Sequence, residues 1–134
     1  MKRVLLFLIA AVASLFDTAG IVYAHHSFAA TYFEDQTVTI DGKLVQFLYR
    51  NPHSFVHVEA PDDKGVVQTW AVEWGAGGQL GRDGVTRESL KPGDHVIITG
   101  NPGRTPEDHR VRMRSIRRPA TDTAAEFSWK GVVQ

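Results

Sequence analysis

The sequence predicts an all-β fold, a small five-stranded OB-like Greek-key barrel with a short helical element between strands 3 and 4. Between residues 37 and 118, apolar and polar residues alternate as they do in half-buried strands, and helical spacing is scarce. Clusters of turn-forming residues separate the alternating runs, and the stretch with helical character lies between the third and fourth runs. The strand count leaves a small β-sandwich as the alternative.

The first strand is expected to run from Val38 to Tyr49, which is rich in β-branched and aromatic residues. Asp41-Gly42 within it fits either a tight hairpin turn or a bend in one long strand. We favour the bend, because a hairpin would leave a first arm of only Thr37 to Ile40, whereas small barrels need long strands that curve at a glycine. Asn51-Pro52 ends the strand, since proline cannot donate to a ladder.

The second and third strands are expected at His53 to Ala60 and Val66 to Trp74, joined by a turn over Pro61 to Gly65. Alternate residues of a strand share a face, and the more apolar face should pack on the core. That face of the second strand carries Ser54, Val56, Val58 and Ala60, and the other carries His53, Phe55, His57 and Glu59.

Two short helical segments are expected after the third strand, a single turn at Gln79 to Arg82 and a helix capped by Thr86 that reaches Leu90. The glycine-rich stretch "GAGGQLG" that holds the first segment has spacing close to a dinucleotide fingerprint, but no βαβ unit surrounds it. His95 to Gly100 and Val111 to Arg118 complete the five strands.

Residues 1–24 have the parts of a secretory signal peptide. Lys2 and Arg3 precede an apolar run from Val4 to Phe16, and Ala24 offers the small residue that signal peptidase requires. A membrane anchor is the alternative, but Asp17 interrupts the apolar run before the roughly 18 residues that a span requires. We therefore expect a periplasmic or secreted protein that is not inserted in a membrane after cleavage.

The mature chain is then expected to hold one barrel domain, residues 25–119, and a C-terminal tail, residues 120–134, in which Phe127 and Trp129 can dock. Removing the leader takes away two of the 15 basic and one of the 15 acidic residues, so the formal charge is −1 with histidine neutral. The chain has no cysteine, which excludes disulfides and thiolate metal sites.

Basic residues gather toward the C-terminus, where a stripe of this kind can bind nucleic acid. We do not expect nucleic acid as a partner, because the leader directs the chain away from it and acidic residues interrupt the stripe. The simpler interpretation is a strand whose arginines form a solvated face; a surface for an acidic partner or anionic lipid is the alternative. The stripe comprises Arg104, Arg110, Arg112, Arg114, Arg117 and Arg118.

Four segments resemble, in order and spacing, a family of small secreted bacterial proteins that is known only as a domain of unknown function. They are "AHHSFAATY", "NPHSFVHVE", "WAVEWGA" and "RDGVTRESLKPGDHVIITG", and the resemblance extends from His25 to about Arg118. The resemblance implies secretion and a fold, and it transfers no activity. Any site must be argued from the chemistry of the residues.

Cleavage after Ala24 would leave His25 at a free N-terminus, where the α-amine and the imidazole Nδ1 can chelate one ion. A third nitrogen from the barrel would complete an array that suits Cu(II), the divalent ion with the highest affinity for such sites. Secreted copper carriers and copper oxygenases with a terminal histidine brace have this local feature. We therefore predict a copper site that includes His25.

His53 is the favoured third ligand, because the Asn51-Pro52 turn fixes its backbone at a barrel rim. His57 is the second choice; four residues of strand separate the two by roughly 13 Å, so one of them at most belongs to the site. His26 is the partner if the terminus alone forms the site. His95 and His109 rank behind these.

Zinc is the weaker alternative, since structural zinc sites take four ligands and the fourth would be Glu59, Glu34 or Asp35. The sequence gives little support for an enzyme, having no cysteine nucleophile and no Gly-x-Ser-x-Gly elbow. Glu59 and Glu73 are expected to face outward on neighbouring strands as a surface carboxylate pair; an acid/base pair is the alternative, but the sequence implies no cleft around it. The terminal histidines also have a purely structural interpretation, as tolerated residues on a frayed end.

The alternative from a different class is a module that binds a peptide, a glycan or a protein without metal. It would use the barrel face on which OB-type folds hold ligands. This hypothesis requires that several aromatic residues be exposed together, although aromatic residues of small barrels usually fill the interior. The residues are Phe47, Tyr49, Phe55, Trp70 and Trp74.

Overall fold

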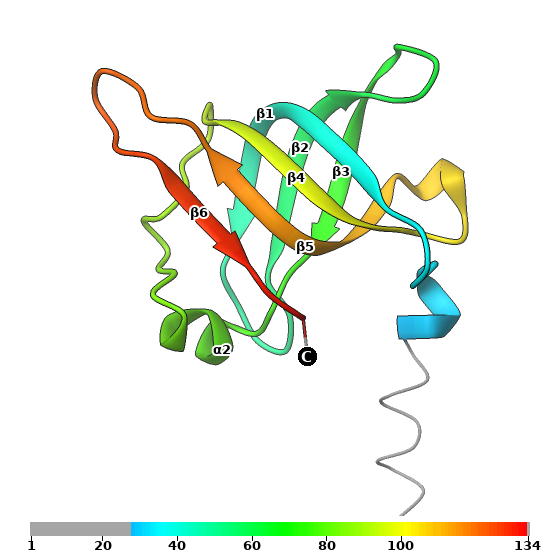
Figure 1. Ribbon diagram of the computed structural model, residues 1–134, viewed down its shortest axis with the longest axis horizontal. Coiled ribbons are helices and arrows are strands. Elements are labelled where there is room, and N and C mark those ends of the chain that lie inside the picture. The colour runs from blue at the N-terminus through cyan, green and yellow to red at the C-terminus, as the bar shows by residue number, and fades with distance from the viewer. Residues whose placement is uncertain (1–27, 134) are drawn as a thin grey trace, which may run out of the picture. The chain divides into compact units, whose positions relative to one another are not determined.

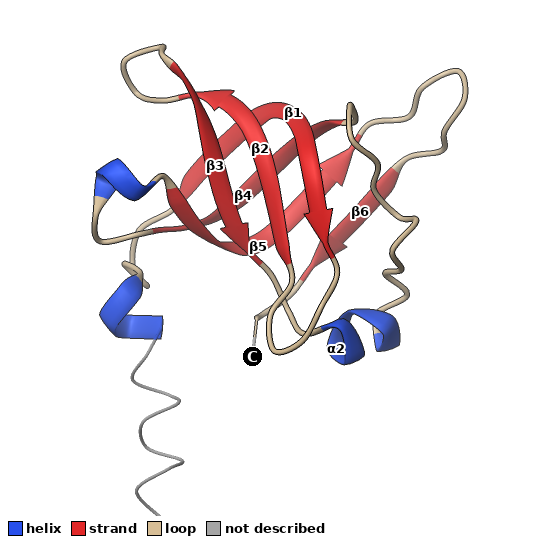
Figure 2. Cartoon of the chain, turned by 180° about the vertical axis from the view of Figure 1, so that it is seen from behind, coloured by secondary structure: helices blue, strands red, loops and turns tan. Residues whose placement is uncertain are grey.

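The computed structural model describes residues 28–133, so the predicted leader and both terminal histidines, His25 and His26, lie outside the described residues. The chain divides into two units between Thr31 and Tyr32. Residues 28–31 form a turn of helix in the first unit. The second unit holds the sheet (Figures 1 and 2). Within the described range, no helix has the length and apolar character that crossing a bilayer requires.

The described part of the second unit contains six strands, one α-helix and one 3-10 turn. In chain order these are β1 (Val38–Leu48), β2 (Phe55–Pro61), β3 (Val67–Glu73), α2 (Gly77–Arg82), β4 (His95–Pro102), the 3-10 turn (Pro106–Asp108), β5 (Arg110–Arg118) and β6 (Phe127–Lys130).

Five of these strands close into the predicted barrel. β1 pairs antiparallel with β2 and with β4, β2 pairs with β3, and β4 pairs with β5. A short parallel pairing of β3 with β5, from Ala71 to Glu73, closes the ring. The order β1-β2-β3-β5-β4 is that of an OB-type Greek key. Closure rules out the sandwich alternative, because two packed sheets would leave β3 and β5 on separate edges.

Gly42 is the point at which β1 passes close to β2, and β1 is one continuous strand as predicted. A Cβ atom built at Gly42 would lie 2.2 Å from the carbonyl oxygen of Glu59 and 2.7 Å from the Cβ of Ala60. Only glycine permits this approach, and the approach lets one strand pair with β2 and β4 at once.

The β2–β3 hairpin follows the predicted alternation. Val56 and Val58 of β2 are fully buried, and so is Val72 opposite Val56 on β3. The carboxylate of Asp62 holds the turn by accepting the backbone N–H groups of Lys64 and Val66, both at 2.9 Å. The side chain of one turn residue therefore fixes the register of the hairpin.

The helical element predicted between strands 3 and 4 is present, but its position differs in part. α2 covers Gly77–Arg82, where Leu80 is fully buried. The expected helix at Thr86 to Leu90 is wrong: these residues form a turn in which the Thr86 N–H donates to Ser89 Oγ at 2.9 Å. Side-chain hydrogen bonds to the backbone compete here with the helical ladder.

The C-terminal tail contains a sixth strand that the sequence-based interpretation lacked. β6 pairs antiparallel with β5, and Trp129 on it is 7% exposed. Its ring packs against Trp74 with centroids 5.2 Å apart, and its indole N–H donates to Asp83 at 3.0 Å. The expected docking of Trp129 is therefore confirmed. Its contacts stabilise β6, a strand of four residues that is too short to be predicted from its sequence pattern.

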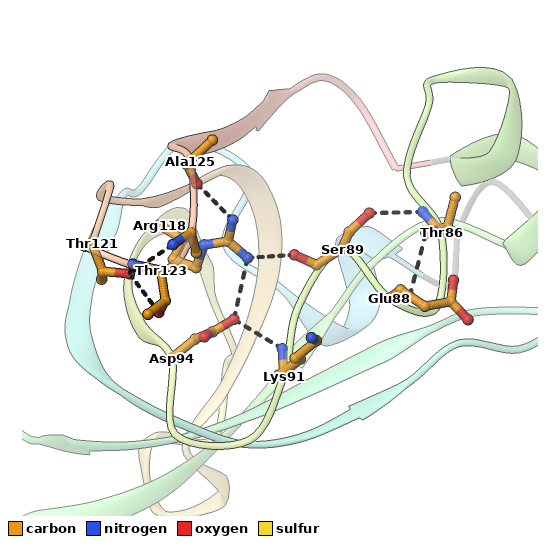
Figure 3. A network of polar contacts seen from close by, with 10 residues as sticks. Thr86, Glu88, Ser89, Lys91, Asp94, Arg118, Thr121, Thr123 and Ala125 are labelled. Atoms are coloured by element: carbon orange, nitrogen blue, oxygen red, sulfur yellow. Dashed lines mark hydrogen bonds and ion pairs between the residues drawn. The ribbon is translucent and has the colours of Figure 1, made fainter.

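The C-terminal arginines form hydrogen bonds and ion pairs with other segments of the same chain. The expected solvated face of β5 is wrong for Arg112, which is 6% exposed and donates to the carbonyl of Val133. Arg118 links three segments, since it donates to the carbonyls of Ser89 and Ala125, both at 2.7 Å, and pairs with Asp94 (Figure 3). The other contacts are Arg110 with Glu73, Arg112 with Glu34, Arg114 with Asn101, Arg117 with Glu126, and Arg104 over the ring of Phe33.

Gly42→Ala is expected to destabilise the barrel by about 2 kcal/mol or more, because the new methyl group must displace the backbone of β2. The free energy of unfolding in urea measures this. Gly78→Ala in α2 is the matched control, since the nearest atom to its new Cβ is a guanidinium nitrogen of Arg82 at 4.0 Å. It should leave stability unchanged or raise it by up to about 1 kcal/mol. Equal effects of the two substitutions would contradict the close approach.

Candidate functional site

A buried carboxylate stands at the end of β3. Glu73 lies on the outer face of the barrel, because its neighbours Val72 and Trp74 point into the core and are fully buried. Glu73 is nevertheless only 7% exposed. A carboxylate can be buried at this depth only if hydrogen-bond donors surround it.

Three donors meet this carboxylate, and together they form what we call the Glu73 cluster. Nδ1 of His53 lies 2.5 Å from Oε1 of Glu73. The hydroxyl of Tyr32 donates to Oε2, and the guanidinium of Arg110 donates to the same oxygen at 3.3 Å. Both carboxylate oxygens are thus satisfied, and the negative charge of Glu73 is balanced by Arg110.

Local structure holds His53 beside the end of β3. His53 follows the Asn51-Pro52 turn, whose peptide bond is cis, and it precedes the fully buried Ser54. The backbone N–H of Ser54 donates to the carbonyl of Gly75 at 3.0 Å, and the N–H of Trp74 donates to the carbonyl of Ser54 at 2.8 Å. These two bonds fix the start of β2 against the end of β3.

Tyr32 and Arg110 arrive from other parts of the chain. Tyr32 forms an isolated antiparallel bridge with Gly103, ahead of β1. Arg110 is the first residue of β5 and pairs with Ala71, two residues before Glu73. The cluster therefore joins the β1–β2 loop, the segment before β1, and the parallel closure of the barrel.

The Tyr32 hydroxyl remains protonated over the physiological range. Burial raises its pKa well above the usual 10.0, and the hydrogen bond to Glu73 and the negative charge of Glu73 raise it further. Arg110 acts in the opposite direction with a smaller effect. Tyr32 therefore remains a hydrogen-bond donor to Oε2 of Glu73, and His53 contacts the other oxygen, Oε1.

The other histidines of the described chain lie apart from this cluster. His57 contacts the side-chain oxygen of Gln46 at 3.3 Å, and His95 contacts Asp41 at 2.6 Å on an exposed surface. The ring of His109 packs edge-on against Trp70, with centroids 5.1 Å apart. His53 and His57 therefore have different partners, Glu73 and Gln46.

Residues 28–133 alone offer no group of three or more His, Asp or Glu side chains that could hold a metal ion. Among the carboxylates considered for zinc, Glu34 pairs with Arg112 at 3.3 Å, and Asp35 and Glu59 are exposed. The carboxylate that reaches His53 is Glu73. It meets the nitrogen Nδ1, so it orients the imidazole.

The expectation that Glu73 and Glu59 form a surface pair is wrong. In the register Glu59 lies opposite Thr69, whereas Glu73 lies opposite Phe55. Glu73 is on the outer face as expected, but Tyr32 and His53 cover it. Strand periodicity predicts which face of the sheet a residue lies on. It cannot predict that side chains from distant parts of the sequence bury that residue.

The aromatic residues do not form one exposed face. Trp74 is fully buried, and Phe47 packs on it with ring centroids 5.6 Å apart. Tyr49 contacts Phe47 edge-on and donates its hydroxyl to the carbonyl of Gly77. Trp70 lines a cavity elsewhere, and Phe55 is half-buried beneath the guanidinium of Arg50.

Alkaline pH is expected to destabilise the protein through Tyr32. A group whose pKa is raised in the folded state contributes stability below its unfolded pKa, here 10.0, and loses it progressively as pH rises toward the folded pKa. The free energy of unfolding should therefore fall above about pH 10, and this fall should be smaller in Tyr32→Phe. Tyr49→Phe is the control, and an identical loss in Tyr32→Phe and the wild type would contradict the role of Tyr32.

Comparison with known proteins adds one match. The model of a family of unknown function matches residues 12–112. No curated protein matches the chain.

Proposed function

The chain belongs to this family, DUF6152, and we propose that this member is a secreted copper-binding barrel, a carrier or sensor in which His53 supplies the barrel's ligand. The contact between His53 and Glu73 is the observation that carries the proposal. Histidines that bind metals almost always donate their second ring nitrogen to a carboxylate or carbonyl, which fixes the tautomer and raises ligand basicity. The 2.5 Å contact of Nδ1 with a buried carboxylate has this form.

Since Nδ1 faces Glu73, Nε2 is the nitrogen of His53 that would bind the ion. The remaining nitrogens are proposed to come from the mature N-terminus, as the α-amine and the Nδ1 of His25. Tyr32, which belongs to the Glu73 cluster, follows His25 by seven residues in the sequence. His26 and His57 are the reserve ligands.

Copper fits this ligand set better than zinc does. Three nitrogens in a planar or T-shaped array suit Cu(II), whereas zinc seeks a fourth ligand in tetrahedral geometry. Glu73 is a poor candidate for that fourth ligand, because its two oxygens already accept hydrogen bonds from His53, Tyr32 and Arg110. Its geometry suits the orienting role.

The processed protein should bind Cu(II) with a Kd below about 1 µM, since three nitrogens chelate the ion. Calorimetric titration measures the affinity, and N-terminal sequencing establishes that the chain begins at His25. A form with one extra residue before His25 should bind far more weakly, because it lacks the terminal chelate. Equal binding by both forms, or binding by neither, would overturn the proposed role of His25.

In the processed protein, we expect His53→Ala to lower the affinity for Cu(II) at least as much as Glu73→Gln does. For Glu73→Gln we expect a loss of about 10- to 100-fold. The glutamine keeps the size of the side chain but weakens the acceptor that orients His53. His57→Ala is the matched control, as another histidine of the same β2 region, and should bind as the wild type does. If His57→Ala weakened binding and His53→Ala did not, the assignment of the barrel ligand would be wrong.

A further inference from the structure

One edge of β3 is paired over only part of its length. The N–H of Ala71 donates to the carbonyl of His109 at 2.9 Å, and the parallel pairing with β5 covers only Ala71 to Glu73. Backbone groups alternate sides along a strand, so those of Thr69 and Val67 point the same way as those of Ala71. Within residues 28–133, no strand pairs with β3 on that side before Ala71.

β2 does not use these groups, because it pairs with the opposite side of β3. The hydrogen bond from Asp62 N–H to the Val66 carbonyl, at 2.8 Å, places Val66 and every second residue after it in the bonded pairs of the hairpin. Thr69 lies opposite Glu59 in a pair that exchanges no backbone hydrogen bond. The exposed edge is extended at its start by Val66 and Val67, which are 54% and 65% exposed.

The chain before β5 leaves the edge open. His109 has a left-handed backbone with φ of 45°, and it ends the 3-10 turn Pro106–Asp108. β5 therefore begins only at Arg110 and cannot continue along β3 toward Val67. Figure 2 shows this loop, with its blue helical turn, on the β3 side of the barrel.

A cavity of about 610 Å³ lies between the edge of β3 and this loop. Gln68 and Trp70 of β3 line it together with Pro106, His109 and Phe33. The indole N–H of Trp70 donates to the carbonyl of Ala60 at 3.1 Å, so the ring is held in place. A strand added to the edge would direct alternate side chains toward this hollow.

The lining of the cavity carries an excess of negative charge when histidine is neutral. Asp62, Asp63 and Glu107 contribute carboxylates, and Lys64 contributes one positive charge. Arg110 also lines the cavity, but its charge is matched by Glu73. Charge complementarity therefore favours a basic partner.

We propose that the free edge of β3 and the adjoining cavity bind an extended basic peptide segment by β-strand addition. Main-chain groups of Val67 and Thr69 pair with the peptide backbone, and the cavity over Trp70 receives an apolar side chain between basic ones. Unpaired edges with exposed valines are otherwise a liability that proteins cover. This site is independent of the copper proposal.

Thr69→Pro tests the proposal directly. Proline removes the outward N–H of Thr69 and leaves the β2–β3 hydrogen bonds in place, because Thr69 donates none to β2. Random peptides displayed on phage are selected on the full processed protein, and enriched peptides are synthesised and titrated. We expect sequences with Lys or Arg flanking an apolar residue, with affinity about tenfold lower for Thr69→Pro. Thr69→Val, which keeps the N–H, should bind as the wild type does.

Glu107→Lys provides a second variant, at an exposed position of the 3-10 turn that lines the cavity. It should weaken the same peptides and reduce the dependence of their affinity on salt. The proposal is overturned if no peptide is enriched over the Thr69→Pro protein, or if enriched peptides bind both variants unchanged. Enrichment of acidic peptides, or binding of oligosaccharides in place of peptides on a glycan array, would also overturn it.

Discussion

The burial of the Glu73 carboxylate is the constraint that organises the end of the barrel where β3 pairs with β5. A charge at 7% exposure must be met by donors, and three segments of the chain supply them. Tyr32 comes from the segment before β1, His53 from the β1–β2 loop, and Arg110 from the start of β5. The same carboxylate thereby braces the parallel closure of β3 with β5 and sets the orientation of one imidazole.

The alternation of apolar residues was enough to predict the barrel, because strand period and turn residues are local properties. Val56 and Val58 face the core, and β1 continues through Gly42 as one strand, as the pattern indicates. The same local pattern does not predict the burial of Glu73, because Tyr32, which contacts its carboxylate, is 41 residues away in the sequence. It also fails for β6, a strand of four residues whose position depends on the contact of Trp129 with Trp74.

The arginine-rich C-terminal stretch shows how composition can mislead. As a sequence it has the density of basic residues seen in surfaces for polyanions. In the fold, Arg112 is buried and Arg118 joins the turn at Asp94 to the segment before β6 (Figure 3). These guanidinium groups hold the last strands in place. The open edge of β3 is the contrasting case, a surface that no sequence pattern marked and that exists because β5 begins only at Arg110.

The position of the proton on the neutral His53 ring decides whether Glu73 orients this imidazole as a ligand. Nitrogen-15 NMR of the imidazole reports which ring nitrogen carries the proton in the neutral form. We expect the proton on Nδ1, donated to Glu73, with Nε2 as the acceptor that a metal would use. A neutral ring protonated on Nε2 would contradict it, because Glu73 would then not orient His53 as a ligand.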